Sequence, residues 1–314
     1  MSSKEHPRIV FMGTPEFAVP SLEALLEAGY PVVGVITATD KMGGRGGKQL
    51  LESPVKKAAV HHGIPVLQPR NLKSEAFQES LRELRADLQI VVAFRMLPEA
   101  VWDMPPLGTF NLHGSLLPMY RGAAPINWAV INGETETGGT TFFIRHEIDT
   151  GDMLLQTRLP IGENDTAGDV HDRLMLQGAQ LVVETVQLIE AGAYTLQKQD
   201  DSAATPAPKL NREMARIDFN RPAREVHNFV RGLSPWPAAW TELEGKQLKL
   251  IRSRVGKPLS GVQPGTIEAS GDEIRVACAD AWLLVDELQL AGRRRMTTAE
   301  FLRGSDLSPD TVLQ

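Results

Sequence analysis

Apolar residues in the first half of the chain alternate between short runs and helical stripes. Arg8–Gly13 is an apolar run that ends in glycine, which is typical of a buried parallel strand. Three leucines then recur at helical spacing between residues 22 and 26, and Gly29 ends that segment. Further strands are expected at 31–38, 64–67, 88–94, 107–113, 140–145 and 153–159, and further helices at 55–62, 75–84, 124–131 and 166–191. Repeated β-α-β units of this kind predict a Rossmann-like α/β fold, with a mostly parallel sheet covered by helices on both faces.

The pattern changes after residues 200–208, a small, polar, proline-bearing segment that is typical of a linker. One amphipathic helix is expected beyond it, at 221–232, and short alternating runs follow, separated by glycine-containing turns. The runs expected as strands are 239–244, 247–254, 265–269, 273–277 and 282–290. This pattern predicts a small C-terminal β-barrel with an OB-like fold. We therefore expect a first domain at 1–199, a linker at 200–212 and a second domain at 213–314.

Composition and charge narrow the class of protein. The chain is 42% hydrophobic and 23% charged, as in soluble globular proteins. No apolar run approaches the ~20 residues that span a bilayer, and the polar start leads us to expect no secretory signal. The single cysteine, Cys278, excludes an internal disulfide and a cysteine-based metal site, and fits a reducing cytoplasm. The net charge of −6 argues against a protein coated in nucleic acid, although residues 206–314 are slightly basic.

Asn111 and His113 lie two residues apart near the C-terminal end of a predicted strand, so their side chains project from one face. Asp149 lies in a tight Asp-Thr-Gly turn between two later strands. An amide or a protonated imidazole stabilises a developing oxyanion, while a base accepts a proton and a carboxylate fixes the imidazole. These groups are what acyl transfer to an amine requires. The sequence contains no nucleophile elbow and no metal-binding spacing.

Each of these signals has a simpler explanation when taken alone. A lone histidine at a strand end is more often structural than catalytic, and Asp-Thr-Gly is usually just a turn. The segment Ser115–Pro125 that follows the strand is, however, unusually apolar for a loop, and its prolines and Gly122 constrain its path. The ordered combination of this loop with the three polar residues favours the catalytic interpretation.

Several segments together resemble the folate-dependent formyltransferases. The segments that carry the resemblance are Asn111–Pro118, Arg121–Pro125 and Asp149–Asp152. Within that superfamily, the chain is similar to the members that act on methionyl-tRNA. The segments that carry this closer resemblance are Met12–Phe17, Pro208–Leu210, Ala215–Asp218 and Pro235–Pro237. The resemblance runs from residue 8 to residue 303 and so covers nearly the whole chain.

The resemblance implies transfer of a formyl group from 10-formyltetrahydrofolate to the α-amino group of charged initiator methionyl-tRNA, in support of translation initiation. It implies direct attack by the neutral amine, with Asn111, His113 and Asp149 as the catalytic residues. The sequence itself leads us to expect no metal and no membrane partner, and we expect a cytoplasmic monomer. The residues that the resemblance places at the folate are Ser115, Leu116, Leu117, Pro118, Phe94, Met96 and Leu97.

The chain departs from the family at one point in the folate site. The family commonly has Tyr-Gly after the alanine of the apolar strand, where backbone groups and apolar walls hold the pterin ring. This chain has Phe94-Arg95 after Ala93. Phe94 still supplies an apolar wall, whereas Arg95 introduces a charge whose direction the sequence does not determine.

Two basic regions are candidates for contact with nucleic acid. Asp40–Lys48 has four glycines and three basic residues, which suits close approach to phosphates. Such a segment is more often a solvated loop, and it lacks the P-loop pattern. In the enzymes that the chain resembles, however, the corresponding insertion enters the acceptor arm of the tRNA.

A second basic region runs along the predicted C-terminal strands at Lys246, Lys249, Arg252 and Arg254, and the alternative there is a solvated charged face. The contacts expected with tRNA are Lys41, Arg45, Lys48, Lys209, Arg293, Arg294 and Arg295.

The residues leave other functions open. The same catalytic trio would formylate a small amine, such as an amino-sugar nucleotide or glycinamide ribonucleotide, or would hydrolyse a formyl-folate. The ribonucleotide activity needs only the first domain, which would leave residues 206–314 unexplained. A dinucleotide-binding module is disfavoured because Gly13 stands alone in place of the Gly-x-Gly-x-x-Gly fingerprint. An RNA-binding protein with a decayed catalytic domain is disfavoured because the trio is complete.

Overall fold

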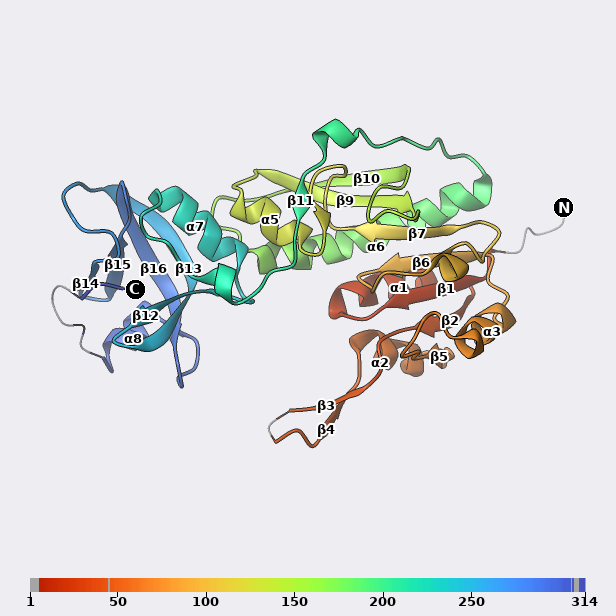
Figure 1. Cartoon of the computed structure of the whole chain (residues 1–314), viewed down its shortest axis with the longest axis horizontal. Coiled ribbons are helices and arrows are strands. Elements are labelled where there is room, and N and C mark those ends of the chain that lie inside the picture. The colour runs from red at the N-terminus through yellow and green to blue at the C-terminus, as the bar shows by residue number, and fades with distance from the viewer. Residues whose placement is uncertain (1–5, 45, 306, 308–310, 314) are drawn as a thin grey trace. The chain divides into compact units, whose positions relative to one another are not determined.

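The computed structural model describes residues 6–44, 46–305, 307 and 311–313. The chain divides into two compact units, each made of several stretches of sequence (Figure 1). The first unit comprises Met1–Gly122, Gly138–Leu159 and His171–Pro206. The second unit comprises Ala123–Thr137, Pro160–Val170 and Ala207–Gln314. None of the helices among the described residues is long and apolar enough to cross a membrane.

The first unit contains a mixed sheet with the strand order β10-β9-β7-β6-β1-β2-β5. Its strands are β1 (Ile9–Gly13), β2 (Val32–Ile36), β5 (Val66–Leu67), β6 (Leu88–Val92), β7 (Thr109–His113), β9 (Glu136–Phe143) and β10 (Met153–Pro160). From β5 to β7 every neighbouring pair is parallel, whereas β9 runs antiparallel to β7. The mostly parallel sheet predicted from the apolar runs is confirmed.

Helices cover both faces of this sheet. The helical elements are η1 (Glu16–Ala18), α1 (Val19–Glu27), α2 (Pro54–His61), α3 (Glu75–Glu83), α4 (Glu99–Trp102) and α6 (Ala167–Ala191). On one face, Met12 of β1 shares a core cluster with Phe77 of α3. The strand register places Leu112 beside Val92 and Val92 beside Gly13, so Leu112 points to the opposite face from Met12. There Leu112 packs closely on α6 at Gly178, where an added Cβ would lie 2.8 Å from its Cδ2 atom.

The glycine-rich segment after β2 forms a β-hairpin rather than an irregular loop. Its strands are β3 (Lys41–Gly43) and β4 (Gln49–Leu51), which pair antiparallel. Apolar side chains stand exposed on it, including Met42 and Leu50. The sequence did not predict these strands because each has only three residues, too few to show a period.

The second unit contains the predicted antiparallel C-terminal sheet. Its strand order is β12-β13-β16-β15-β14, and β17 pairs with β16. The strands are β12 (Ala239–Leu243), β13 (Lys246–Pro258), β14 (Ile267–Ser270), β15 (Glu273–Ala277), β16 (Ala281–Leu290) and β17 (Met296–Thr297). The helices are α5 (Pro125–Ile131), α7 (Ala223–Gly232) and α8 (Thr298–Leu302). Apolar side chains of α7, the sheet and α8 form one core cluster.

Short elements accompany the segment that runs from the first unit into the second. These are β8 (Arg121–Gly122), η2 (Asp201–Ala203), β11 (Pro206–Ala207) and η3 (Glu213–Ala215). The predicted linker at 200–212 thus contains regular structure. Asp200 caps η2, because its side chain accepts a hydrogen bond from the Ser202 N–H at 3.0 Å.

A buried histidine in α7 holds part of the second unit together. His227 is 1% exposed, and its Nε2 atom donates to the Glu163 carbonyl oxygen at 3.1 Å. Its Nδ1 atom lies 3.0 Å from the Ser253 hydroxyl. Burial lowers the pKa of His227, because desolvation disfavours the imidazolium form.

We therefore expect the protein to lose stability on mild acidification. Below the pKa of an unfolded histidine, about 6.5, the unfolded chain gains a proton that folded His227 resists, so stability falls as the pH decreases through the folded pKa. A His227→Gln variant should show a smaller loss of stability between pH 7.5 and pH 5.5 in urea unfolding. A variant of the exposed His61, His61→Gln, should keep the wild-type pH dependence. An equal loss in wild type and His227→Gln would contradict the assignment.

Candidate active site

Asn111 and His113 lie in the last part of β7, at the carboxyl ends of the parallel strands. This edge of an α/β sheet is where ligands usually bind. The strand register pairs Asn111 with Val91 of β6 on one side and with Phe142 of β9 on the other. Asn111 is half-buried, and His113 is 6% exposed. The sequence prediction that both side chains share one face of the strand agrees with this regular pairing.

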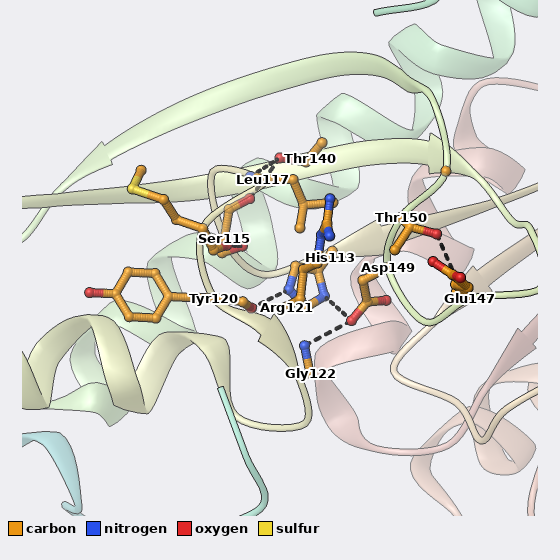
Figure 2. Close-up of polar contacts among 12 residues, drawn as sticks. His113, Ser115, Leu117, Tyr120, Arg121, Gly122, Thr140, Glu147, Asp149 and Thr150 are labelled. Carbon is orange, nitrogen blue, oxygen red and sulfur yellow. Dashed lines mark hydrogen bonds and ion pairs between the residues drawn. The ribbon is translucent and has the colours of Figure 1, made fainter. Parts of the chain in front are cut away.

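The imidazole of His113 is held from both sides, as Figure 2 shows. Its Nε2 atom lies 2.8 Å from the carbonyl oxygen of Tyr120. A carbonyl oxygen only accepts, so Nε2 carries a hydrogen and donates it. The Nδ1 atom faces Asp149, with 3.7 Å between Nδ1 and Oδ2. That separation is longer than a hydrogen bond, so the two groups face each other without a direct hydrogen bond.

Asp149 occupies a turn whose backbone accounts for the Asp-Thr-Gly sequence. Its φ angle of 56° is left-handed, a conformation that aspartate tolerates better than most side chains. Its Oδ2 atom accepts a hydrogen bond from the Gly122 N–H at 2.9 Å. Gly151 is required because an added Cβ would lie 1.7 Å from the carbonyl oxygen of Phe143. The turn therefore fixes the carboxylate opposite His113.

A residue that the sequence analysis missed, Gln199, anchors this turn. Its Nε2 atom donates to the carbonyl oxygens of Asp149 at 2.9 Å and of Gly151 at 2.8 Å. Its Oε1 atom accepts from two guanidinium nitrogens of Arg121, at 3.0 Å and 2.7 Å. Gln199 is 6% exposed, so both ends of its amide are satisfied inside the protein. The sequence offered no local signal for it, because every one of these partners is distant in the chain.

The start of the predicted linker also contacts this region. Thr205 accepts hydrogen bonds from the Tyr120 N–H through its hydroxyl and from the Arg121 N–H through its carbonyl, both at 2.8 Å. Tyr120 supplies the carbonyl that holds His113. Gln199 thus supports the turn that carries Asp149, and Thr205 supports the Tyr120 backbone that contacts His113.

Hydrogen bonds fix the apolar loop that follows β7. The Ser115 hydroxyl donates to the Met119 carbonyl at 2.6 Å, and the Thr140 hydroxyl donates to the Ser115 carbonyl at 2.7 Å. Thr140 also accepts from the Leu117 N–H at 3.1 Å (Figure 2). The side chains of Ser115, Leu116 and Leu117 are buried, whereas Pro118 is half-buried. The loop is therefore a rigid wall beside His113.

The structure shows where the charge of Arg95 points. Its guanidinium donates to the carbonyl oxygens of Arg70 and Pro69 and lies over the Phe94 ring, 5.6 Å from its centroid. The arginine thus attaches the segment after β6 to the segment after β5. Met96 is 69% exposed and Leu97 is buried. Arg95, which replaces the family's glycine, therefore adds hydrogen bonds between these two segments.

Two family models match the chain. A formyl transferase model matches residues 7–186, and a formyl transferase C-terminal domain model matches residues 209–306. The chain belongs to the formyltransferase family. It is 54% identical to a methionyl-tRNA formyltransferase of Bacteroides fragilis over 315 residues, with 97% of each chain covered. It is 56% identical to the protein of the same name from Parabacteroides distasonis over 312 residues, with 96% of each covered.

Solved structures of more distant proteins share the fold. The sugar 3N-formyl transferase WlaRD, crystallised with 5-N-formyl-THF, matches with a TM-score of 0.67 at 21% identity, over 92% of this chain and 99% of that one. HypX from Aquifex aeolicus in complex with tetrahydrofolic acid matches with a TM-score of 0.65 at 18% identity, over 97% of this chain and 49% of that one. At such identities the likeness concerns the fold alone.

The basic residues predicted to contact nucleic acid differ in their surroundings. Lys41 and Lys48 stand exposed on the β3–β4 hairpin, and Lys209 is exposed as well. Arg45 lies outside the described residues. In the cluster that begins at Arg293, Arg294 pairs with Glu300 at 2.8 Å and Arg295 pairs with Glu287. Arg293 itself donates to the Ser305 hydroxyl at 2.8 Å.

The network predicts that Gln199 is a positioning residue for formyl transfer. A Gln199→Met change keeps the volume of the side chain. It removes the hydrogen bonds to the carbonyl oxygens of Asp149 and Gly151, so the Asp149 turn is no longer held. We expect kcat to fall by about 10- to 100-fold, as misplacement of a reacting group typically costs, with little change in KM. The matched control is Gln177→Met, which loses a hydrogen bond to the Arg158 carbonyl away from this turn. Equal kcat values for the two variants would show that Gln199 does not position the Asp149 turn for the reaction.

Proposed function

We propose that the protein transfers a formyl group from 10-formyltetrahydrofolate to the α-amino group of methionyl-tRNA, in support of translation initiation in the cytoplasm. The observation that carries the proposal is near full-length similarity to methionyl-tRNA formyltransferases, at 54% and 56% identity. The arrangement of His113 and Asp149 at the end of β7 supports it chemically.

In this proposal the amine nitrogen attacks the formyl carbon directly. The new C–N bond forms, the bond from the formyl carbon to the folate nitrogen breaks, and the proton lost by the amine ends on that folate nitrogen. Asn111 and His113 stabilise the oxyanion of the tetrahedral intermediate. Asp149 orients His113 and assists removal of the proton. The Nε2–H···Tyr120 hydrogen bond turns the Nδ1 atom toward Asp149, so the reacting atoms would bind on the side of the ring that faces this carboxylate.

The folate would lie between the apolar loop and the segment after β6. Ser115, Leu116 and Leu117 are buried within the loop, so their backbone and Pro118 are the groups that face a ligand. On the other side, Phe94 and the exposed Met96 supply apolar surface, and the buried Leu97 belongs to the core cluster against which Phe94 packs. Arg95 keeps that surface in place through its bonds to the segment after β5.

The tRNA would be bound by residues on both units. We propose residues 1–199 as the catalytic domain, 200–212 as the connection, and 213–314 as the tRNA-binding domain of a monomer. Lys41, Arg45, Lys48, Lys209 and the Arg293–Arg295 cluster are the proposed contacts. Because Arg294 and Arg295 are already ion-paired, we expect them to contribute less than the lysines.

The decisive assay offers 10-formyltetrahydrofolate with four acceptors in parallel. These acceptors are charged methionyl-tRNA, free methionine, an amino-sugar nucleotide and water alone. We expect formyl transfer to the charged tRNA only. Transfer to the amino-sugar nucleotide, or release of formate in water alone, would identify one of the other formyltransferase chemistries and overturn the proposal.

The role of Asp149 predicts the effect of a conservative change. Asp149→Asn keeps the size of the side chain and can still accept from the Gly122 N–H, so the fold and folate affinity should remain nearly unchanged. Turnover should fall by about 100-fold or more, the usual cost of losing a group that assists proton transfer. Asp152→Asn is the matched control, because that carboxylate lies at the same turn and pairs with Arg145. A wild-type kcat in Asp149→Asn would refute the assignment.

A further inference from the structure

The second unit has a hollow of about 320 Å³ beside the first strands of its sheet. A volume of this size is within the usual range for small-ligand sites. The segment around η3, the loop before β12 and the strands β12 and β13 form its walls. Its polar and aromatic lining includes Asn211, Arg212, Trp236, Trp240, Gln247 and Lys249. The catalytic trio is not part of this lining.

Two tryptophans give the hollow its aromatic surface. Trp240 is half-buried, and its indole N–H donates to the Arg212 carbonyl at 2.8 Å. Trp236 is 71% exposed, the largest exposure among the large apolar side chains of the described residues. No ring or guanidinium among those residues stacks on Trp236. An exposed aromatic face at the rim of a hollow is typical of a binding site rather than of a core.

Three cations without carboxylate partners among the described residues lie around the Trp240 ring. The guanidinium groups of Arg212 and Arg216 lie over the Trp240 ring, 5.9 Å and 5.3 Å from its centroid. Lys249 faces Trp240 across the β12–β13 pair, and its Nζ atom is 3.4 Å from the Pro237 carbonyl. In the part of the chain that the structure describes, none of these three cations makes an ion pair. The carboxylate nearest in the strand register is Glu242, which lies beside Gln247.

Four other arginines of the same unit are, by contrast, paired with carboxylates. Arg254 pairs with Asp286 at 2.8 Å and Arg275 pairs with Glu268 at 2.6 Å. Arg294 and Arg295 are also paired, as described above. A phosphate gains more from a cation that has no competing carboxylate, because no existing ion pair must be broken. The hollow is therefore a better anion site than the ion-paired Arg294 and Arg295.

We propose that this hollow binds one unstacked nucleotide of the tRNA, with its base on Trp236 and its phosphate at Arg212, Arg216 and Lys249. Aromatic faces and arginine planes are the groups on which splayed-out bases stack. The amides of Asn211 and Gln247 offer donors and acceptors to a base edge. This inference rests on the proposed function, since it names the part of the nucleic acid that the second unit holds.

The test measures binding of methionyl-tRNA by variants of the full chain. Trp236→Ala should lower affinity by about 5- to 100-fold, the range for loss of one base–aromatic stack, whereas Trp236→Phe keeps a ring and should lose less. Arg216→Gln should weaken binding and reduce the slope of log affinity against log salt by about one. The matched control is Arg254→Gln, which removes an ion-paired arginine from the same sheet. Binding of the wild-type protein should quench tryptophan fluorescence, and Trp236→Phe should abolish part of that quenching.

The outcomes separate this inference from the proposed function. If the wild type formylates methionyl-tRNA while Trp236→Ala and Arg216→Gln bind it with wild-type affinity, the hollow is not a nucleotide site and the proposed function stands. If the wild type formylates only a small amine and does not bind tRNA, both proposals are overturned. An Arg254→Gln variant that loses as much affinity as Arg216→Gln would also overturn the inference, because pairing would then not decide which arginine contacts tRNA. Urea unfolding of each variant verifies that the fold is retained.

Discussion

The Asp149 carboxylate can orient the His113 imidazole only if the backbone that carries the carboxylate is held in place. Asp149 lies in a left-handed turn, and the turn is held by the Gln199 amide, which bonds the carbonyl oxygens on either side of Thr150. The same short segment supplies Thr205, which bonds the Tyr120 N–H, and Tyr120 in turn supplies the carbonyl that orients His113. Both polar partners of the histidine therefore depend on the chain that leaves α6.

Ion pairing sorts the basic residues of the second unit into two classes. A paired arginine must give up its carboxylate before it binds a phosphate, so the exchange yields little net free energy. An arginine that lies over an aromatic ring without a carboxylate partner gives up only water when it binds a phosphate. By this criterion, the paired Arg294 and Arg295 are weaker candidates for nucleic-acid contact than Arg212, Arg216 and Lys249, which lie at Trp240 without a carboxylate partner among the described residues.

Periodicity and turn residues were sufficient to predict the main strands and helices. The sheet and its long helix α6 follow from apolar runs and stripes, which report burial directly. The β3–β4 hairpin was predicted as a loop because strands of three residues have no visible period. Asn111, His113 and Asp149 were singled out as candidates because they fall in motifs near the ends of strands. Gln199 was not, because its contacts join residues separated by about 50 to 78 positions, which no local pattern encodes.

The direction of Arg95 illustrates the same limit and its consequence for specificity. The sequence showed a charge where the family commonly has glycine, and a charge pointing into an apolar pocket would disfavour a pterin ring. The guanidinium instead bonds backbone carbonyl oxygens of the neighbouring segment and covers Phe94. The arginine thus fixes this segment through side-chain hydrogen bonds that a glycine could not make. The proposed folate site is then bounded by two segments, one hydrogen-bonded through Thr140 and one through Arg95.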